Sequence, residues 1–206
     1  MGKFWKILLT VCLFIYPVFV FVTLVVLKKD MSIVSIGMLV IGVAALLFNS
    51  KTGNKITPII MCAASLLFIL TKSEIIIKFY PFWITGVFGW MFLASIIRHD
   101  PIIMHFAELW CPAIKVHPGR AEIQSYCLVW NWIWVAYFVV VEIVNLYLTF
   151  RGSTRAWAIY NGCVSYIAQG LMFVLQFTVN IFFNRSIDRK YCFNRKLENE
   201  KLRNNQ

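Results

Sequence analysis

The sequence predicts an all-α fold, a polytopic bundle of about six transmembrane helices, and two observations support this prediction. Of the 206 residues, 60% are hydrophobic and 14% are charged, a composition that does not suit a soluble domain of this length. The apolar residues also fall in long runs, and a helix needs about 20 of them to cross a hydrocarbon core of about 30 Å. The two observations together exclude a soluble globular protein, and no nucleic-acid partner is expected.

The first three predicted spans are separated only by short polar connections. They cover residues 7–27, 31–48 and 56–71. Gly53-Asn54 is a turn signal between the last two of them. The chain is therefore expected to cross the membrane three times within its first third.

The second half of the chain holds three further spans and one segment between them. The spans cover about 75–97, 128–150 and 157–183. Residues 98–126 are expected to form an interfacial cytoplasmic segment, and the basic residues 184–206 a cytoplasmic tail. The predicted organisation is a single transmembrane helical domain over residues 1–183, followed by this tail.

Lysine and arginine are distributed unequally between the two sides of the predicted bundle. With the N-terminus inside, 14 of the 20 basic residues fall on the cytoplasmic side, and seven of these lie in the tail. Positively charged loops are retained in the cytoplasm. Both termini are therefore expected to be cytoplasmic, and the tail is expected to meet anionic lipid headgroups.

The cysteines give no sign of a metal site or a disulfide framework. All six lie singly, with no pair at the spacing of zinc ligands or of a small disulfide scaffold. We therefore expect no cofactor and no metal. The expected partners are membrane lipids and other membrane proteins of the cell envelope.

All three histidines lie in one stretch after the fourth predicted span, RHDPIIMHFAELWCPAIKVH at 98–117. Asp100-Pro101 is a typical helix start, with Asp as the N-cap and Pro at the first helical position. The apolar residues that follow recur on one helical face. They are Ile102, Ile103, Phe106, Leu109 and Trp110. This pattern predicts a short amphipathic helix that lies in the membrane interface.

The same stretch leaves a chemical alternative open. His99, Asp100, His105 and Glu108 are residue types that bind metals or transfer protons, and His105 and Glu108 share a helical face. His99 and His105 instead fall on opposite sides of a helix, because they are six positions apart. The spacing therefore favours solvated side chains over a catalytic site.

A carboxyl group stands well inside the fifth predicted span. Glu142 shares a helical face with Asn131, Asn145 and Thr149, so polar side chains form a stripe along an otherwise apolar helix. An ionised carboxylate in the apolar phase is costly, so Glu142 is expected to be protonated, paired or turned to a wet cavity.

The sixth predicted span carries a second polar stripe. Its members are Asn161, Ser165, Gln169 and Gln176. The short connection at 151–156 forces an antiparallel hairpin, which sets Glu142 level with Ser165 and Asn131 level with Gln176. Ser165 and Gln169 are thus the expected hydrogen-bond partners of Glu142. The stripes are expected to meet, either as structural interhelical hydrogen bonds or as a proton-linked binding groove.

Several aromatic and proline-containing segments follow a recognisable order. They read IYP at 15–17, KFYPFW at 78–83, RHDPIIMHFAEL at 98–109 and WAIYNGCVSYIAQGLMF at 157–173. Together they resemble a family of small bacterial inner-membrane proteins found among aryl-polyene and related lipid-biosynthesis genes, and more distantly the septation protein A family. The resemblance covers most of 75–183. It implies a multi-pass bacterial inner-membrane protein and supplies no catalytic residues.

The expected function is a non-catalytic, accessory role in cell-envelope or membrane-lipid assembly. The first alternative is a carrier or flippase for a lipidic or aromatic acid intermediate, with Glu142 as the coupling acid. The second is a membrane-bound lipid-modifying enzyme that uses His99, Asp100, His105 and Glu108. A defined co-purifying lipid would favour the carrier, and a bound metal would favour the enzyme.

Overall fold

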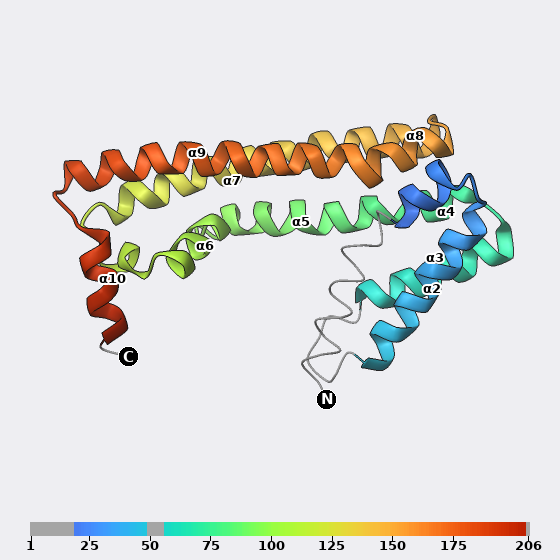
Figure 1. Ribbon diagram of the computed structural model, residues 1–206, viewed down its shortest axis with the longest axis horizontal. Coiled ribbons are helices and arrows are strands. Elements are labelled where there is room, and N and C mark those ends of the chain that lie inside the picture. Colours follow the sequence, from blue (N-terminus) through green and yellow to red (C-terminus); the bar gives the residue numbers. More distant parts are fainter. Residues whose placement is uncertain (1–18, 49–55, 205–206) are drawn as a thin grey trace. The chain divides into compact units, whose positions relative to one another are not determined.

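The computed structural model describes residues 19–48 and 56–204, and every element in these two ranges is a helix (Figure 1). Most of the first predicted span, the segment IYP and the connection at 49–55 lie outside the described residues.

The first half of the described chain follows the predicted spans closely. Its elements are the π-helical turn η1 (Val22–Val26), α2 (Met31–Phe48), α3 (Ile56–Thr71), α4 (Glu74–Lys78) and α5 (Tyr80–Ile97). Helices α2 and α3 begin and end at the residues predicted for the second and third spans. The fourth predicted span is divided into α4 and α5.

The second half contains longer helices than the hydropathy pattern predicts. Its elements are α6 (Ile102–Trp110), the 3-10 helix η2 (Pro112–Val116), α7 (Arg120–Phe150), α8 (Thr154–Ile159), the π-helical turn η3 (Tyr160–Val164), α9 (Ser165–Lys190) and α10 (Arg195–Asn204). Helix α7 begins before residue 128 and α9 ends after Phe183, because a helix continues into polar sequence that a hydropathy window does not count. The tail is itself helical in α10.

Three helical stretches are long and apolar enough to cross a membrane. They are Glu74–Ile97, Arg120–Phe150 and Thr154–Lys190, while the apolar stretches of α2 and α3 are shorter. In Thr154–Lys190, none of the most apolar part is buried inside the protein. A helix of this composition is stable only where an apolar phase covers it. The described residues therefore confirm an all-helical fold, and three of its helices are long and apolar enough to span a membrane.

The described chain forms two compact units. The first comprises Met1–Thr85 and Val141–Ala168, and the second comprises Gly86–Val140 and Gln169–Gln206. The division falls within α5, α7 and α9, so these long helices contribute one end to each unit. Each unit has its own hydrophobic core.

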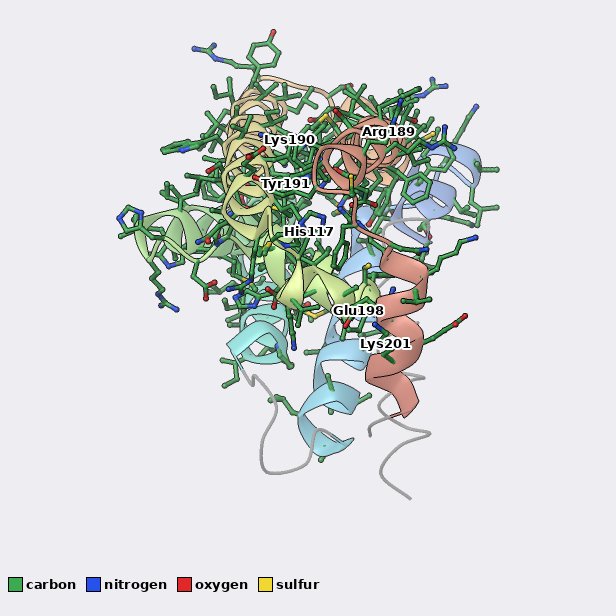
Figure 2. The ribbon with its side chains drawn as sticks, turned by 90° about the vertical axis from the view of Figure 1, so that its left-hand side faces the viewer. His117, Arg189, Lys190, Tyr191, Glu198 and Lys201 are labelled. Carbon is green, nitrogen blue, oxygen red and sulfur yellow. The ribbon has the colours of Figure 1, made fainter. Side chains whose placement is uncertain are left out.

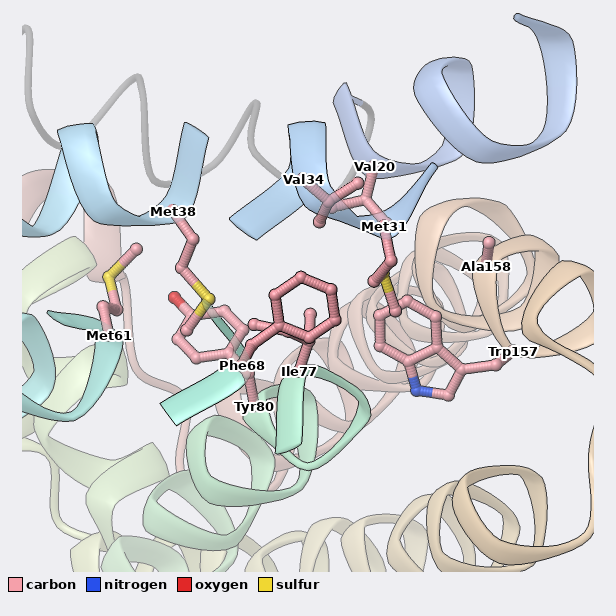
Figure 3. Packing of buried hydrophobic residues seen from close by; sticks show 10 residues of the cluster. All are labelled: Val20, Met31, Val34, Met38, Met61, Phe68, Ile77, Tyr80, Trp157 and Ala158. Atoms are coloured by element: carbon pink, nitrogen blue, oxygen red, sulfur yellow. The ribbon is translucent and has the colours of Figure 1, made fainter. Parts of the chain in front are cut away.

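The core of the first unit is rich in methionine and is shown in Figure 3. Its buried members are Val20, Met31, Val34, Met38, Met61, Phe68, Ile77, Tyr80, Trp157 and Ala158. Small residues let α2 and α3 approach each other: the Ser35 hydroxyl donates to the carbonyl oxygen of Ser65 at 3.3 Å. Such contacts between small polar residues are typical of helices that pack inside a membrane.

A proline explains the break between α4 and α5. Pro81 has no N–H, and its ring crowds the preceding turn, so the helical hydrogen-bond ladder is disturbed there. The carbonyl oxygen of Lys78 accepts two side-chain hydrogen bonds instead, from Thr149 Oγ1 at 3.3 Å and from Trp157 Nε1 at 3.1 Å. These bonds join the end of α4 to α7 and α8.

The core of the second unit is aromatic. Trp134 packs against Phe92, Phe138 and Phe173, with ring centroids 4.9 to 5.9 Å apart. Tyr126 stacks on Phe183 with centroids 3.8 Å apart and planes within 4°. These contacts hold the second-unit ends of α5, α7 and α9 together.

The helix predicted after the fourth span exists, but two details of the prediction were wrong. Pro101, not Asp100, occupies the N-cap of α6, and it makes no side-chain cap. The predicted apolar face is also divided, because Ile103 is buried with Met104, whereas Phe106, Leu109 and Trp110 are exposed. Trp110 is 86% exposed. Helix α6 thus uses one apolar edge for the protein core and leaves the other uncovered.

Candidate functional site

The polar stripe predicted on α7 lies mainly on a buried face. Asn131, Asn145 and Thr149 are all buried, and Glu142 is partly buried. These side chains therefore point inward. Their partners, however, come largely from α4 and α5.

Asn131 shows this difference most clearly. Its amide nitrogen donates to the Ser95 hydroxyl and to the Phe92 carbonyl oxygen, and its amide oxygen accepts from the Ile103 N–H at 3.3 Å. The predicted level partner, Gln176, accepts a hydrogen bond from Trp134 Nε1 at 2.7 Å. The expectation that Asn131 faces Gln176 is corrected: Asn131 joins α7 to α5 and α6.

The other residues of the α9 stripe have local or aromatic partners. Asn161 Nδ2 donates to the Trp157 carbonyl oxygen at 3.1 Å, and the Ser165 hydroxyl donates to the Asn161 carbonyl oxygen at 3.3 Å. Asn180 accepts from the Tyr126 hydroxyl at 2.6 Å. Gln169 lies in the second unit and is partly buried. In the second unit, two aromatic donors on α7, Trp134 and Tyr126, thus bond to amide oxygens of α9.

Glu142 is bonded to a residue that the sequence argument had not included. The Thr85 hydroxyl on α5 is hydrogen-bonded to Glu142 Oε1, and it also lies 2.8 Å from the Pro81 carbonyl oxygen. A hydroxyl has a single proton to donate. When Thr85 gives this proton to Pro81, its oxygen accepts from a protonated Glu142. When Glu142 is ionised, the proton of Thr85 turns to the carboxylate. The pair therefore accommodates both protonation states.

Beside this pair, the structure leaves buried polar atoms without a protein partner. Among the described residues, none bonds to Glu142 Oε2, and none bonds to either side-chain polar atom of Asn145. Asn145 is only 1% exposed. It stands one turn from Glu142 on the same face of α7, where side chains at i and i+3 are neighbours. Buried amides and carboxyls are nearly always hydrogen-bonded, so this pair calls for a functional explanation.

The first unit, which contains Glu142, also includes a segment of irregular helical geometry. The π-helical turn η3 contains Tyr160 and Asn161, and the Tyr160 side chain lies within electrostatic range of the Glu142 carboxyl. π-helical turns occur frequently at functional sites, because the extra residue re-aims side chains and backbone groups. Glu142, Asn145, Thr85 and Tyr160 together form the candidate site, which we call the carboxyl-amide site.

A buried lysine lies along the same face of the first unit. The Lys78 side chain is 8% exposed, and its ammonium nitrogen lies 3.3 Å from Glu74 Oε2. Glu74 is also hydrogen-bonded to the Thr154 hydroxyl. Glu74 therefore neutralises the charge of Lys78 locally.

The residues of the chemical alternative are divided between separate contacts. His105 Nε2 lies 2.8 Å from Asp100 Oδ2, and both side chains are more than half exposed. Glu108 Oε1 accepts from Arg120 Nη2 at 2.7 Å. His99 lines a pocket of about 260 Å³ with Pro101, Ala121, Gln124, Ser125 and Leu128. The part of the chain that the structure describes contains no group of three or more His, Cys, Asp or Glu placed to hold a metal.

The third histidine belongs to a buried cluster that the sequence did not reveal. His117 Nδ1 accepts from the Gly119 N–H at 2.9 Å, so its proton lies on Nε2, 3.2 Å from Asp188 Oδ1. Arg195 Nε donates to the same Asp188 oxygen at 2.7 Å. Figure 2 shows His117 below Tyr191 and Lys190 at this end of the second unit. The cluster ties α9 and α10 to the loop before α7.

Neighbouring contacts strengthen this end of the second unit. The Tyr191 hydroxyl and the Lys190 ammonium both donate to Glu122 Oε1 at 2.6 Å. The hydrogen bond to this carboxylate raises the pKa of Tyr191 above its ordinary value. Asn199 on α10 accepts from the Ala113 N–H at 2.8 Å. The tail is therefore attached to η2 by specific side-chain contacts.

Three residues of the first unit were missed by the sequence argument, and each left a different signal. Lys78 is a charge within the fourth apolar run, which alone marks it as unusual. Thr85 is a single hydroxyl among apolar neighbours, a common pattern that does not predict a functional site. The π-helical turn that contains Tyr160 has no recognisable sequence signature.

Comparisons with protein-family models, with curated proteins and with solved structures found no match to the chain.

Proposed function

We propose that this protein is a non-catalytic carrier that binds a lipidic or aromatic acid intermediate of envelope or membrane-lipid assembly, with Glu142 as the coupling acid. A single observation supports the proposal: Glu142 Oε2 and the Asn145 amide are buried in a span without a partner among the described residues. Intramembrane ionisable groups mark substrate or ion pathways when they face a cavity or a ligand.

A coupling acid must exist in two protonation states. The Thr85 hydroxyl meets this requirement, because it donates to the carboxylate or, when bonded to Pro81, accepts from the neutral acid. An acid substrate bound near a neutral Glu142 avoids the repulsion that two carboxylates would suffer. Proton release from Glu142 would then disfavour the bound substrate and promote its departure.

The proposed setting is a bacterial inner membrane crossed six times, with both termini in the cytoplasm. Helices α2 and α3 have 18 and 16 residues, which at 1.5 Å per residue give about 27 and 24 Å. These lengths approach a hydrocarbon core of about 30 Å.

The exposed edge of α6 supports an interfacial position for this helix. Phe106, Leu109 and Trp110 are uncovered, while Lys115 and Arg120 are exposed nearby in the sequence. Aromatic side chains beside basic groups suit the boundary between acyl chains and anionic headgroups. In this arrangement α6 rests on the cytoplasmic leaflet.

A purely accessory role is the second candidate function, and the surface of α9 favours it. Leu171, Phe173, Val174 and Phe177 are all more than half exposed. Lipid covers such a surface in a carrier, whereas another envelope membrane protein would cover it in an accessory subunit. The two roles differ in whether the carboxyl-amide site is needed.

Lipid extraction from the purified protein tests the carrier. The parent and the Glu142→Gln variant are purified in nanodiscs, and bound lipids are identified by mass spectrometry. We expect one acidic species enriched with the parent and lost with the variant. Glu122→Gln is the matched control, because Glu122 is an exposed carboxylate at the far end of the same helix. Equal lipid content in parent and Glu142→Gln would refute the carrier and leave the accessory role.

Maleimide labelling tests the orientation. Cys192 is exposed, so a membrane-impermeant reagent should reach it only in inside-out vesicles. A cysteine placed at Ser153, between α7 and α8, should react only in right-side-out cells. The opposite pattern would reverse the proposed topology.

A further inference from the structure

The carboxyl-amide site has the chemistry of a cation site, not only of a proton acceptor. A proton shared between Glu142 Oε1 and Thr85 accounts for that contact, but it leaves Glu142 Oε2 and the Asn145 amide without partners among the described residues. Asn145 is 1% exposed, and neither its oxygen nor its nitrogen has a partner among the described residues. A buried amide without partners is costly, so a ligand that uses its oxygen would offset that cost.

The oxygen groups of the Thr85–Glu142 pair and of Asn145, one turn along α7, suit a hard cation. Glu142 supplies a carboxylate, Asn145 an amide oxygen and Thr85 a hydroxyl oxygen. Oxygen-only donor sets bind hard cations in preference to transition metals, which favour imidazole and thiolate. The first unit also contains the irregular turn η3. Irregular helical backbone is also where membrane carriers coordinate Na⁺.

The charge balance selects a monovalent ion. Within this site Glu142 is the single acidic side chain, and the ammonium of Lys78 is already paired with Glu74. A monovalent cation on one carboxylate leaves a neutral complex in the apolar phase. A divalent cation would leave a net positive charge there, which costs several kcal/mol after relaxation.

From these observations we infer that Glu142, Asn145 and Thr85 bind Na⁺ within the membrane. This inference rests on the proposed carrier and names its coupling ion. Na⁺ and a proton compete for Glu142, since each neutralises the same carboxylate. Asn145 distinguishes Na⁺ binding from protonation. Its oxygen coordinates Na⁺, but it makes no contact with a proton that is held between Glu142 and Thr85.

Equilibrium binding of ²²Na⁺ to the purified full-length protein in nanodiscs tests the inference without any transport assay. We expect saturable binding by the parent, displaced by excess Na⁺ or Li⁺ and not by choline or Mg²⁺. Lowering the pH should weaken the binding as protons occupy Glu142. Glu142→Gln should abolish it, and Asn145→Val should weaken it at least tenfold.

Two controls keep the test independent of folding. Thr149→Val alters a hydroxyl one turn from Asn145 on the same face, and Glu122→Gln removes a carboxylate at the exposed end of α7; both should bind ²²Na⁺ as the parent does. Asn145→Asp adds a second carboxylate and should admit Ca²⁺ in competition with ²²Na⁺. This gain of a divalent ion cannot arise from misfolding.

The outcomes distinguish the cation site from the carrier. Absence of saturable ²²Na⁺ binding, or equal binding by Asn145→Val and the parent, would overturn the inference. If a bound acidic lipid still depended on Glu142 in that case, the carrier would stand with a proton as its coupling ion. Specific ²²Na⁺ binding without a bound lipid would instead support the ion site and refute the substrate.

Discussion

Replacement of Glu142 by leucine should have little effect on stability, although Glu142 is the most unusual residue of its span. The variant loses the hydrogen bond between Thr85 and Oε1, a contact worth about 0.6 to 2 kcal/mol between membrane helices. Thr85 keeps the Pro81 carbonyl oxygen at 2.8 Å as an acceptor, so its hydroxyl stays satisfied. The change also removes Oε2, a buried oxygen without a partner among the described residues.

The two contributions nearly cancel. Relief of an unsatisfied buried polar atom is worth about 1 to 3 kcal/mol, which offsets the lost hydrogen bond. We therefore expect the free energy of unfolding of Glu142→Leu to lie within about 1 kcal/mol of that of the parent. Binding of the acidic lipid and of Na⁺ should nevertheless be lost.

Asn131→Leu is the matched comparison on the same stripe of α7. It removes three hydrogen bonds and leaves the buried Ile103 N–H without its acceptor. The expected loss of stability is about 2 to 4 kcal/mol. Steric-trapping measurements of unfolding in bicelles give both values on one scale. A Glu142→Leu variant destabilised as much as Asn131→Leu would show that Glu142 is structural, and would refute the argument from Thr85.

The remaining predictions concern other contacts. Trp157→Phe should lower the unfolding free energy by about 1 kcal/mol, because the Lys78 carbonyl loses one of two donors; an unchanged value in the same assay would contradict this. Gly119→Ala should destabilise the packing at the end of α9, since the new Cβ would lie 2.5 Å from Tyr191 Cε2. We expect the tail of this variant to be cleaved faster by proteases than that of the parent. His105→Gln should leave the free energy of unfolding unchanged, because His105 is exposed. His117→Gln should lower it by about 1 to 3 kcal/mol, because the His117 side chain is fully buried. Equal melting temperatures of the two variants would disprove this difference. The hydrogen bond from the Tyr191 hydroxyl to Glu122 should persist at neutral pH, because Tyr191 is protonated there. It should be lost when the pH rises through the raised pKa of Tyr191, and absorbance at 295 nm measures this deprotonation.

The sequence predicted the helices of the first unit better than their contacts. Apolar run length fixes where a membrane helix must lie, so α2 and α3 match their predicted bounds. Helical periodicity likewise placed Glu142 and Asn145 on one face. It could not show that α5 supplies the partner, because Thr85 is one hydroxyl in a run with no polar stripe of its own.

The predicted contact between Asn131 and Gln176 across the hairpin was wrong for a related reason. Equal depth across a turn identifies which residues of two consecutive helices are level, but α7 also packs against α5. Asn131 bonds to Ser95 and Phe92 of α5. The α9 amides Gln176 and Asn180 instead accept from Trp134 and Tyr126, which the stripe did not include. The prediction treated Trp134 and Tyr126 as apolar residues, although each side chain carries one hydrogen-bond donor.

The two asparagines of the α7 stripe separate structure from function on a single helix. Asn131 and Asn145 have the same side chain, the same face and nearly the same burial. Every polar atom of Asn131 has a partner, which is the expected arrangement for a residue that holds helices together. Asn145 has none among the described residues, and it stands one turn from a carboxyl that is also half satisfied. Packing demands explain the first asparagine and leave the second unexplained. A ligand that uses the Asn145 oxygen at the carboxyl-amide site accounts for the unpartnered oxygen, and Asn145→Val should therefore impair binding more than it impairs folding.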